Sequence, residues 1–234
     1  MPHWKNEQLQ LLLNEQEPQK LFKLAVELVQ GLEMTYLGLT LHLQVSAHPP
    51  QVVLYNNYPT EWNARLQDAD FFRQDPVASL CHRSTLPVLW RDELYREVPH
   101  FREAACNHGL RHGWTQSVQD LRHNESQLSV ARASGEIGTA EFYEKSSQVL
   151  WLCNTLHTLI SEHHLSLLAP EPSLSERELE VLKWSAAGKT AEDIAHILSL
   201  STSTVNFHIR SVITKTNAAN MAGAIAIAAN RGLL

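Results

Sequence analysis

Apolar residues recur along this chain with two spacings, and each spacing predicts a different kind of element. A helical spacing runs from Leu9 to Leu28, with a break near Pro18, and stops at Gly31. The same spacing over residues 139–164 predicts one long helix. Strand-like runs lie between the two helical segments, at residues 34–43, 52–55, 113–118 and 126–131.

These strands predict the architecture of the first part of the chain. The Pro49-Pro50 pair separates the first two strands, and the polar stretch DLRHNES separates the last two. Residues 59–83 are a polar stretch that is helical or irregular. A short apolar run follows at residues 86–90, and a helix over residues 101–109 ends at a glycine. Helices before and after an antiparallel sheet predict an α-β-α sandwich, an α+β fold, over residues 1–165.

The two prolines of LLAPEPS cannot continue the long helix, so we expect a linker over residues 166–173. The rest of the chain, residues 174–234, carries the caps of four short helices. Ser175 and Glu178 form a capping box at the start of the first helix. The later helices begin at Thr190, Ser201 and Asn220, and glycines end the first and the fourth, at Gly188 and Gly232. This pattern predicts an all-α helix-turn-helix domain of four helices.

The third of these helices, residues 202–216, has two distinct faces. Its apolar positions recur at helical spacing and should face the core: Val205, Ile209, Val212 and Ile213. The opposite face carries Ser203, Asn206, Arg210 and Thr214. Asn bonds adenine and Arg bonds guanine in bidentate fashion, so this face suits a DNA major groove. A solvated helix face is the alternative that these residues alone leave open.

Charge does not by itself point to DNA. The net charge of the 234-residue chain is −6. Residues 1–172 hold 13 basic and 20 acidic side chains, whereas residues 173–234 hold 6 and 5. Because the second part is close to neutral, its non-specific attraction to phosphate should be modest. Dimerisation and specific contacts must then contribute more to binding.

The C-terminal segments LSERELEVLKW, AAGKTAEDIAHILSLSTSTVNFHIRSVITK and RGLL resemble the DNA-binding domain of LuxR-type regulators. The matching positions are Glu178, Leu182, Gly188, Thr204, Val205, His208 and Lys215. The resemblance implies that Asn206 and Arg210 read bases, and that Lys189, His208 and Lys215 lie nearer phosphate. It places the DNA contacts at Lys189, Thr190, Ser203, Thr204, Asn206, His208, Arg210 and Lys215. Two positions depart from the family: Thr216 replaces the usual Leu and should soften the core, and Met221 replaces a common basic residue.

The N-terminal part offers a cluster of aromatic and polar residues: Tyr58, Trp62, Asp75, Trp90, Tyr95 and Phe101. Core packing is the alternative for each aromatic. Asp75 precedes Pro76 among apolar residues and needs hydrogen-bond donors if it is buried. A helix cap at Asp75 is an alternative that does not exclude binding.

The segments NYPTEW, QDPV, LPVLW, GLRHGW and LSVAR resemble the autoinducer-binding domain of quorum-sensing LuxR-type proteins. Those relatives bind N-acyl-homoserine lactones. The resemblance implies that Trp62 donates to the lactone carbonyl, that Asp75 accepts from the amide N–H, and that Tyr58 and Ser129 serve the acyl carbonyl. Trp90, Tyr95, Phe101 and Ala105 would wall the lactone ring, and Gly113 would keep the pocket open. Leu66 stands where the family usually has Tyr, which widens the expected range of acyl chains.

Other classes of function find little support. His108 and His112 have the spacing of a metal pair, but Gly109 lies between them and no Glu accompanies them, so we expect no metal. The three cysteines are scattered and should be reduced and structural. There is no nucleophile–base pattern, P-loop or dinucleotide motif, so we expect no enzymatic activity or cofactor. We also expect no membrane segment, because no apolar run approaches about 20 residues, and no signal peptide, so the cytoplasm is the expected location.

The sequence thus predicts a ligand-responsive transcription regulator. Its expected partners are an N-acyl-homoserine lactone, double-stranded operator DNA and a second copy of the chain, with RNA polymerase as a further candidate. The long helix of residues 139–164 is the candidate dimer face, and simple packing on its own sheet is the alternative. A regulator of the same build that pairs with another regulator, or that answers a different small molecule, is the second hypothesis.

Overall fold

The computed structural model describes residues 4–44, 51–167, 173–230 and 232–234. The chain divides into two compact units: the described residues from 173 onward belong to the C-terminal unit, and most of those between 4 and 167 belong to the N-terminal unit. The expected Pro49-Pro50 turn, and residues 168–172 of the expected linker, lie outside the described residues.

A five-stranded antiparallel sheet forms the centre of the N-terminal unit, in the order β2-β1-β5-β4-β3. Its strands are β1 (Tyr36–Leu43), β2 (Gln51–Asn56), β3 (Val88–Leu89), β4 (His112–Gln119) and β5 (Glu125–Arg132). β1 and β5 are far apart in the sequence but pair along nearly their whole length, from Tyr36 opposite Ala131 to His42 opposite Glu125. β2 is an edge strand that pairs with β1.

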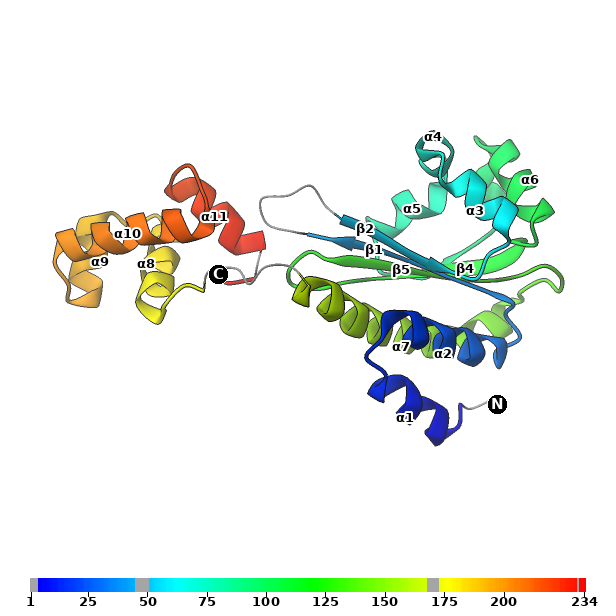
Figure 1. Ribbon diagram of the computed structural model, residues 1–234. Helices are drawn as coiled ribbons and strands as arrows, with labels where there is room; N and C mark the ends of the chain where they lie inside the picture. The colour runs from blue at the N-terminus through cyan, green and yellow to red at the C-terminus, as the bar shows by residue number, and fades with distance from the viewer. Residues whose placement is uncertain (1–3, 45–50, 168–172, 231) are drawn as a thin grey trace. The chain divides into compact units, whose positions relative to one another are not determined.

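Helices cover both faces of this sheet (Figure 1). On one face lie α2 (Pro18–Gln30) and α7 (Thr139–Ser166), with α1 (Asn6–Asn14) beside them. The other face carries short helices, α3 (Thr60–Leu66), α4 (Ala69–Phe72), α5 (Pro76–Cys81), η1 (Asp92–Tyr95) and α6 (Pro99–Asn107). Proline begins α5 and α6 because its missing N–H has no partner to lose in the first turn.

The face that meets α2 and α7 is mainly apolar. Leu37, Leu39, Leu41 and Leu43 alternate along β1 and are fully buried in the same core as residues of both helices. Trp114 of β4 is also fully buried there and meets Phe142 of α7 edge-on. Because successive strand residues point to opposite faces, the residues between these leucines face the short helices.

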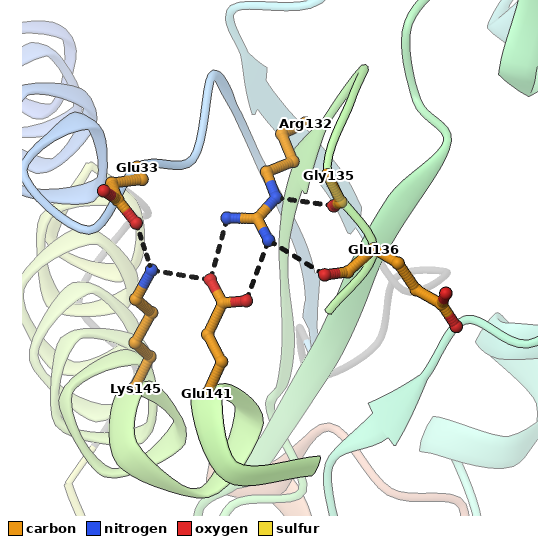
Figure 2. Close-up of polar contacts among 6 residues, drawn as sticks. All are labelled: Glu33, Arg132, Gly135, Glu136, Glu141 and Lys145. Carbon is orange, nitrogen blue, oxygen red and sulfur yellow. Dashed lines mark hydrogen bonds and ion pairs between the residues drawn. The ribbon is translucent and has the colours of Figure 1, made fainter. Parts of the chain in front are cut away.

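An ion-pair network fixes the connection between β5 and α7 (Figure 2). The Arg132 guanidinium donates two parallel hydrogen bonds to the Glu141 carboxylate, both 2.8 Å long, and a third to the Gly135 carbonyl. Lys145 bridges Glu141 and Glu33, with N–O distances of 2.7 and 3.0 Å. Bidentate Arg–carboxylate pairs are geometrically specific, so the network sets where α7 begins.

The described residues of the C-terminal unit form four helices, α8 (Glu176–Ala186), α9 (Ala191–Leu198), α10 (Thr202–Thr216) and α11 (Met221–Asn230). The side chains of Ser175, Thr190 and Ser201 cap the first three, as predicted. Ser199 adopts a left-handed conformation, with φ of 55°, and makes the tight turn between α9 and α10. The Asn220 side chain accepts from the Gly223 N–H at the start of α11.

The predicted fold class is therefore confirmed: an α-β-α sandwich with an antiparallel sheet, and a helix-turn-helix unit of four helices. The structure adds two details. The apolar run at 86–90 yields only the two-residue strand β3. Thr216 does not leave a polar defect in the core, because its buried hydroxyl donates to the Val212 carbonyl at 2.8 Å.

Candidate functional site

A cavity lies between the sheet and the short helices of the N-terminal unit. Nine of the ten residues predicted to bind ligand line it: Tyr58, Trp62, Leu66, Asp75, Trp90, Tyr95, Phe101, Ala105 and Ser129. They come from α3, η1, α6, β5 and the connecting loops, so only the tertiary fold brings them together. The space enclosed is about 80 Å³.

Gly113, the tenth residue, lies behind the cavity wall. A Cβ atom at this position would stand 2.4 Å from the Val130 carbonyl oxygen and 2.9 Å from the Trp90 ring. Glycine at 113 therefore lets Trp90 pack flat against β4. Its effect on the cavity is indirect, through the position of the indole.

Hydroxyl groups form a chain across the floor of the cavity. The indole N–H of Trp90 donates to Thr115 Oγ1 at 3.0 Å, and Thr115 Oγ1 shares a hydrogen bond with Ser129 Oγ at 2.9 Å. Tyr58 continues the chain, because its hydroxyl also bonds the Ser129 side chain. Burial raises the pKa of Tyr58, so the phenol stays neutral and keeps its proton to donate.

Asp75 places a carboxylate in this largely aromatic space. One of its oxygens accepts from the Val77 N–H at 2.9 Å and caps α5, which the cap interpretation predicted. Burial raises the pKa of Asp75 to about 6, although the Val77 hydrogen bond opposes the shift. The side chain is thus mainly ionised at pH 7 and above, and its second oxygen has no hydrogen-bond donor among the described residues.

Trp62 is held by aromatic neighbours on three sides. Its side chain is buried, at 3% exposure, with the Phe71 and Phe101 rings edge-on at centroid distances of 5.7 Å. The His108 ring lies 5.6 Å away, and His108 Nδ1 donates to the Ala104 carbonyl. No described residue accepts a hydrogen bond from the Trp62 indole N–H, which is therefore a donor available to a bound molecule.

The exposed face of α10 carries the predicted base-reading side chains. Ser203, Asn206, Arg210 and Thr214 are all exposed, while Val205 and Val212 are fully buried. Phe207 also lies on the outside of α10, with 63% of its surface exposed, and the sequence analysis did not single it out. A large exposed aromatic beside polar residues is the signal that was missed, since Phe can contact the thymine methyl group.

The residues assigned to phosphate differ in how available their side chains are for contact with DNA. Lys189 is exposed, next to the start of α9, and His208 of α10 is partly buried. Thr190, which was assigned to DNA but not to phosphate, donates its hydroxyl to Asp193 at 2.7 Å. Lys215, by contrast, donates to Glu178 Oε2 at 2.8 Å and to the Ser173 carbonyl. Glu178 is buried, which would raise its pKa, but hydrogen bonds from Lys215, Ser211 and Ser175 hold that pKa at about 2.

Comparison with known protein families shows which family each of the two units matches. A family described as "Autoinducer binding domain" matches residues 17–159, and one described as "Bacterial regulatory proteins, luxR family" matches residues 172–228. The chain belongs to the LuxR family of quorum-sensing transcription regulators.

Individual relatives of this LuxR-family chain support the same family assignment. Regulatory protein SdiA of Escherichia coli (strain K12) is 35% identical over 206 residues, which cover 88% of this chain and 86% of SdiA. Transcriptional activator protein AnoR of Acinetobacter nosocomialis is 29% identical over 238 residues, with 100% of both chains covered. The structure of SdiA in complex with octanoyl-rac-glycerol has a TM-score of 0.75 and 32% identity, and it covers 99% of this chain and 98% of that chain. These relatives are transcription regulators, not enzymes.

The sequence analysis missed several cavity residues of this LuxR-family chain, above all Gly38, Thr40, Thr115 and Gln127. All four point to the same face of the sheet as Ser129, and all are small or polar. A Cβ atom at Gly38 would stand 2.0 Å from the Tyr58 hydroxyl oxygen, so Gly38 makes room for Tyr58. Polar residues on the inner face of a covered sheet were the available signal.

The described residues contain neither a candidate metal site nor a candidate membrane-spanning helix. In those parts of the chain, no three His, Cys, Asp or Glu side chains lie close enough to bind a metal ion. Among the same residues, no helix is both long enough and apolar enough to cross a bilayer.

Proposed function

We propose that this regulator binds an N-acyl-homoserine lactone in residues 1–165 and operator DNA, as a homodimer, through residues 174–234. Ligand binding in the cavity would stabilise the dimer that presents two α10 helices to half-sites about one helical turn apart. The observation that carries the proposal is the cavity, which nine of the ten predicted ligand-binding residues line.

The polar atoms around the cavity suit the polar atoms of such a lactone. Trp62 offers an indole N–H to the lactone carbonyl, and the second carboxylate oxygen of Asp75 would accept from the amide N–H. Tyr58 and Ser129 offer hydroxyls to the acyl carbonyl. A mostly apolar cavity with a few convergent polar groups is how small-molecule sites are generally built.

The cavity volume gives the proposal a mechanical consequence. The enclosed space of about 80 Å³ is smaller than the roughly 300 Å³ at which sites for small organic ligands begin. The lining side chains must therefore move apart to admit an acyl-homoserine lactone. A ligand that fills this space becomes part of the core between sheet and short helices, and its binding should stabilise the N-terminal unit.

Thermal unfolding with a panel of acyl-homoserine lactones tests this function. A ligand at about 100 times its Kd adds roughly 2.7 kcal/mol to the free energy of unfolding. Trp62→Phe, which keeps the ring and removes the N–H donor, should lose most of this shift. Trp151→Phe is the matched control, because Trp151 lies on α7 outside the cavity. The proposal fails if no member of the panel shifts the unfolding of the wild-type protein.

DNA binding has its own test. In vitro selection from random duplexes should recover an inverted repeat whose half-sites lie about one helical turn, 10 base pairs, apart. A single unrepeated site would contradict binding as a dimer. Loss of selection with Asn206→Ala and Arg210→Ala together would place the reading surface on α10.

A second candidate is a regulator that answers a different acyl compound or pairs with another regulator. Octanoyl-rac-glycerol, which is bound in the SdiA structure, supports the first version, because it has an acyl chain but no amide. A glycerol hydroxyl could donate to Asp75 in place of an amide N–H. Parallel titrations with lactones and acylglycerols distinguish the ligands, and mass spectrometry of co-purified complexes reveals a mixed dimer.

A further inference from the structure

A second cleft in the N-terminal unit borders the cavity around Asp75 and is larger than that cavity. Its volume is about 490 Å³, within the range of sites for small organic ligands. It lies among η1, α6, the start of β4 and the segment that joins β5 to α7. Of the described residues, only Trp90 lines both spaces, so the cleft is separate from the cavity proposed for the lactone.

Among the described residues, five charged side chains line this cleft, and most of their charge is unpaired. One ion pair joins two of them, Arg102 Nε and Asp92 Oδ1, at 2.9 Å. Arg91, Glu93 and Glu136 are exposed and form no ion pair with a described residue. Figure 2 shows the Glu136 side chain pointing away from the ion-pair network at the start of α7. We name these five residues, together with His112, the charged cleft.

The inner part of the charged cleft offers hydrogen-bond donors. The Arg102 side chain is 15% exposed, and its Nη1 atom is buried without an acceptor among the described residues. Its guanidinium lies over the Tyr95 ring, 5.2 Å from the centroid. Gly138 and Thr139 at the start of α7 also line the cleft, and Gly138 has no side chain to cap the first N–H groups of this 28-residue helix. A buried donor without an acceptor, beside a helix start, favours an anionic group at this end.

The environment of His112 agrees with a positive inner end. Burial lowers the pKa of His112. The nearby positive charges of Arg102, Arg111 and Arg132 lower that pKa further, and only Glu136 opposes them. The imidazole is therefore neutral at neutral pH, so it can donate or accept a hydrogen bond without adding charge.

The rim of the charged cleft has the opposite balance. Its exposed charged side chains are Arg91, Asp92, Glu93 and Glu136, and three of these four are carboxylates. A simple anion would lie close to these carboxylates, and a simple cation would leave Arg102 Nη1 without an acceptor. The cleft as a whole therefore suits a molecule that carries one group of each sign.

We propose that the charged cleft binds a small zwitterion, a free amino acid or a dipeptide, as a second ligand of this regulator. The carboxylate of the zwitterion accepts from Arg102 and from the first turn of α7. Its ammonium group donates to Glu136 and Glu93 at the rim. Because charge-assisted hydrogen bonds form at both ends, recognition depends on the two groups together.

The test is isothermal titration calorimetry of the full-length chain, without lactone, against the twenty standard amino acids and a set of alanyl dipeptides. For each compound that binds, an N-acetylated analogue removes the ammonium charge and a carboxamide analogue removes the carboxylate charge. Each analogue should bind about tenfold more weakly or worse, because a hydrogen bond between charged groups is lost. Equal affinity of either analogue and its parent would overturn recognition of a zwitterion, and so would the absence of binding by every compound at millimolar concentration.

Two substitutions locate the bound compound. Arg102→Gln removes the inner positive charge and Glu136→Gln removes a rim carboxylate, and each should weaken binding by about tenfold. The matched controls are Arg96→Gln and Glu103→Gln, at exposed positions that do not line the cleft, and they should bind as the wild type does. Wild-type affinity in both Arg102→Gln and Glu136→Gln would overturn the assignment to this cleft.

Glu136→Gln keeps the test decisive if Arg102→Gln fails to fold, because Glu136 is exposed whereas Arg102 packs on Tyr95. Melting curves of the unliganded variants identify such a defect. The titrations contain no lactone, so a negative result would leave the proposed lactone function unaffected.

Discussion

The two faces of the N-terminal sheet are made of alternate residues of the same strands, and they differ in chemistry. The face that meets α2 and α7 carries Leu39, Leu128 and Val130, which are almost completely buried. The opposite face carries Thr40, Gln127 and Ser129, which line the cavity. Dense apolar packing on one side supports polar groups and a cavity on the other. The same strands thus provide stability through one set of positions and a binding site through the other.

Neighbouring residues of β5 offer the strongest test of this contrast. Leu128→Ala should lower the free energy of unfolding of the N-terminal unit by about 3 kcal/mol, because it leaves a void in a fully buried core. Ser129→Ala, one residue away on the cavity face, should cost far less. Denaturant titration followed by tryptophan fluorescence measures both. Equal losses would show that the two faces contribute alike to stability.

Asp75 tests the binding side of the contrast. Asp75→Asn keeps a side chain that can cap α5 but removes the negative acceptor. A hydrogen bond to a charged group is worth about 1.5–3 kcal/mol, so lactone affinity should fall by roughly 10- to 100-fold. Isothermal titration calorimetry measures the change. Asp70→Asn, at an exposed position on α4, serves as the control and should bind normally.

Arg210 extends the contrast to the C-terminal unit, where the functional side chains lie on an exposed helix face. Arg210→Ala should weaken operator binding by about 1–3 kcal/mol and relax specificity at one base step. Arg177→Ala removes an exposed positive charge from α8 and should have a smaller effect. Fluorescence anisotropy with the selected operator and single-base variants provides the measurement. Normal binding and specificity in Arg210→Ala would remove Arg210 from the reading surface.

The smallest expected effect is a difference in pH dependence between two carboxyl groups. Burial raises the pKa of Asp75 to about 6, so protonation favours the folded state and stability from this group increases as pH falls below 6. Hydrogen bonds hold the pKa of Glu178 at about 2 against the effect of its burial, so its contribution is complete above pH 4.5 and is lost as pH falls toward 2. Melting curves of Asp75→Asn and Glu178→Gln between pH 2.5 and 7.5 should therefore diverge from the wild type in opposite directions. Parallel curves would contradict the assigned environments.

The sequence alone determined most of the elements and their capping. Periodicity located α2, α7 and the strands β1, β2, β4 and β5 within a few residues. An element that buries one face carries apolar residues at its own structural period, so the sequence shows that period directly. Ser175, Thr190 and Ser201 act through hydrogen bonds to residues close by in the chain, so their roles could be assigned without the fold.

Only the tertiary structure decided how distant residues meet. The register of β1 against β5 sets Thr40 beside Gln127, and the pairing of β4 with β5 sets Thr115 beside Ser129. No local pattern encodes these neighbours, which explains why the resemblance pointed to Ser129 but the polar sheet face around it went unnoticed. The engagement of Lys215 by Glu178 and the meeting of Arg102 and Glu136 at the charged cleft have the same origin. Whether a side chain is buried, paired or free depends on contacts made across the whole chain, because packing forms only when separate segments come together.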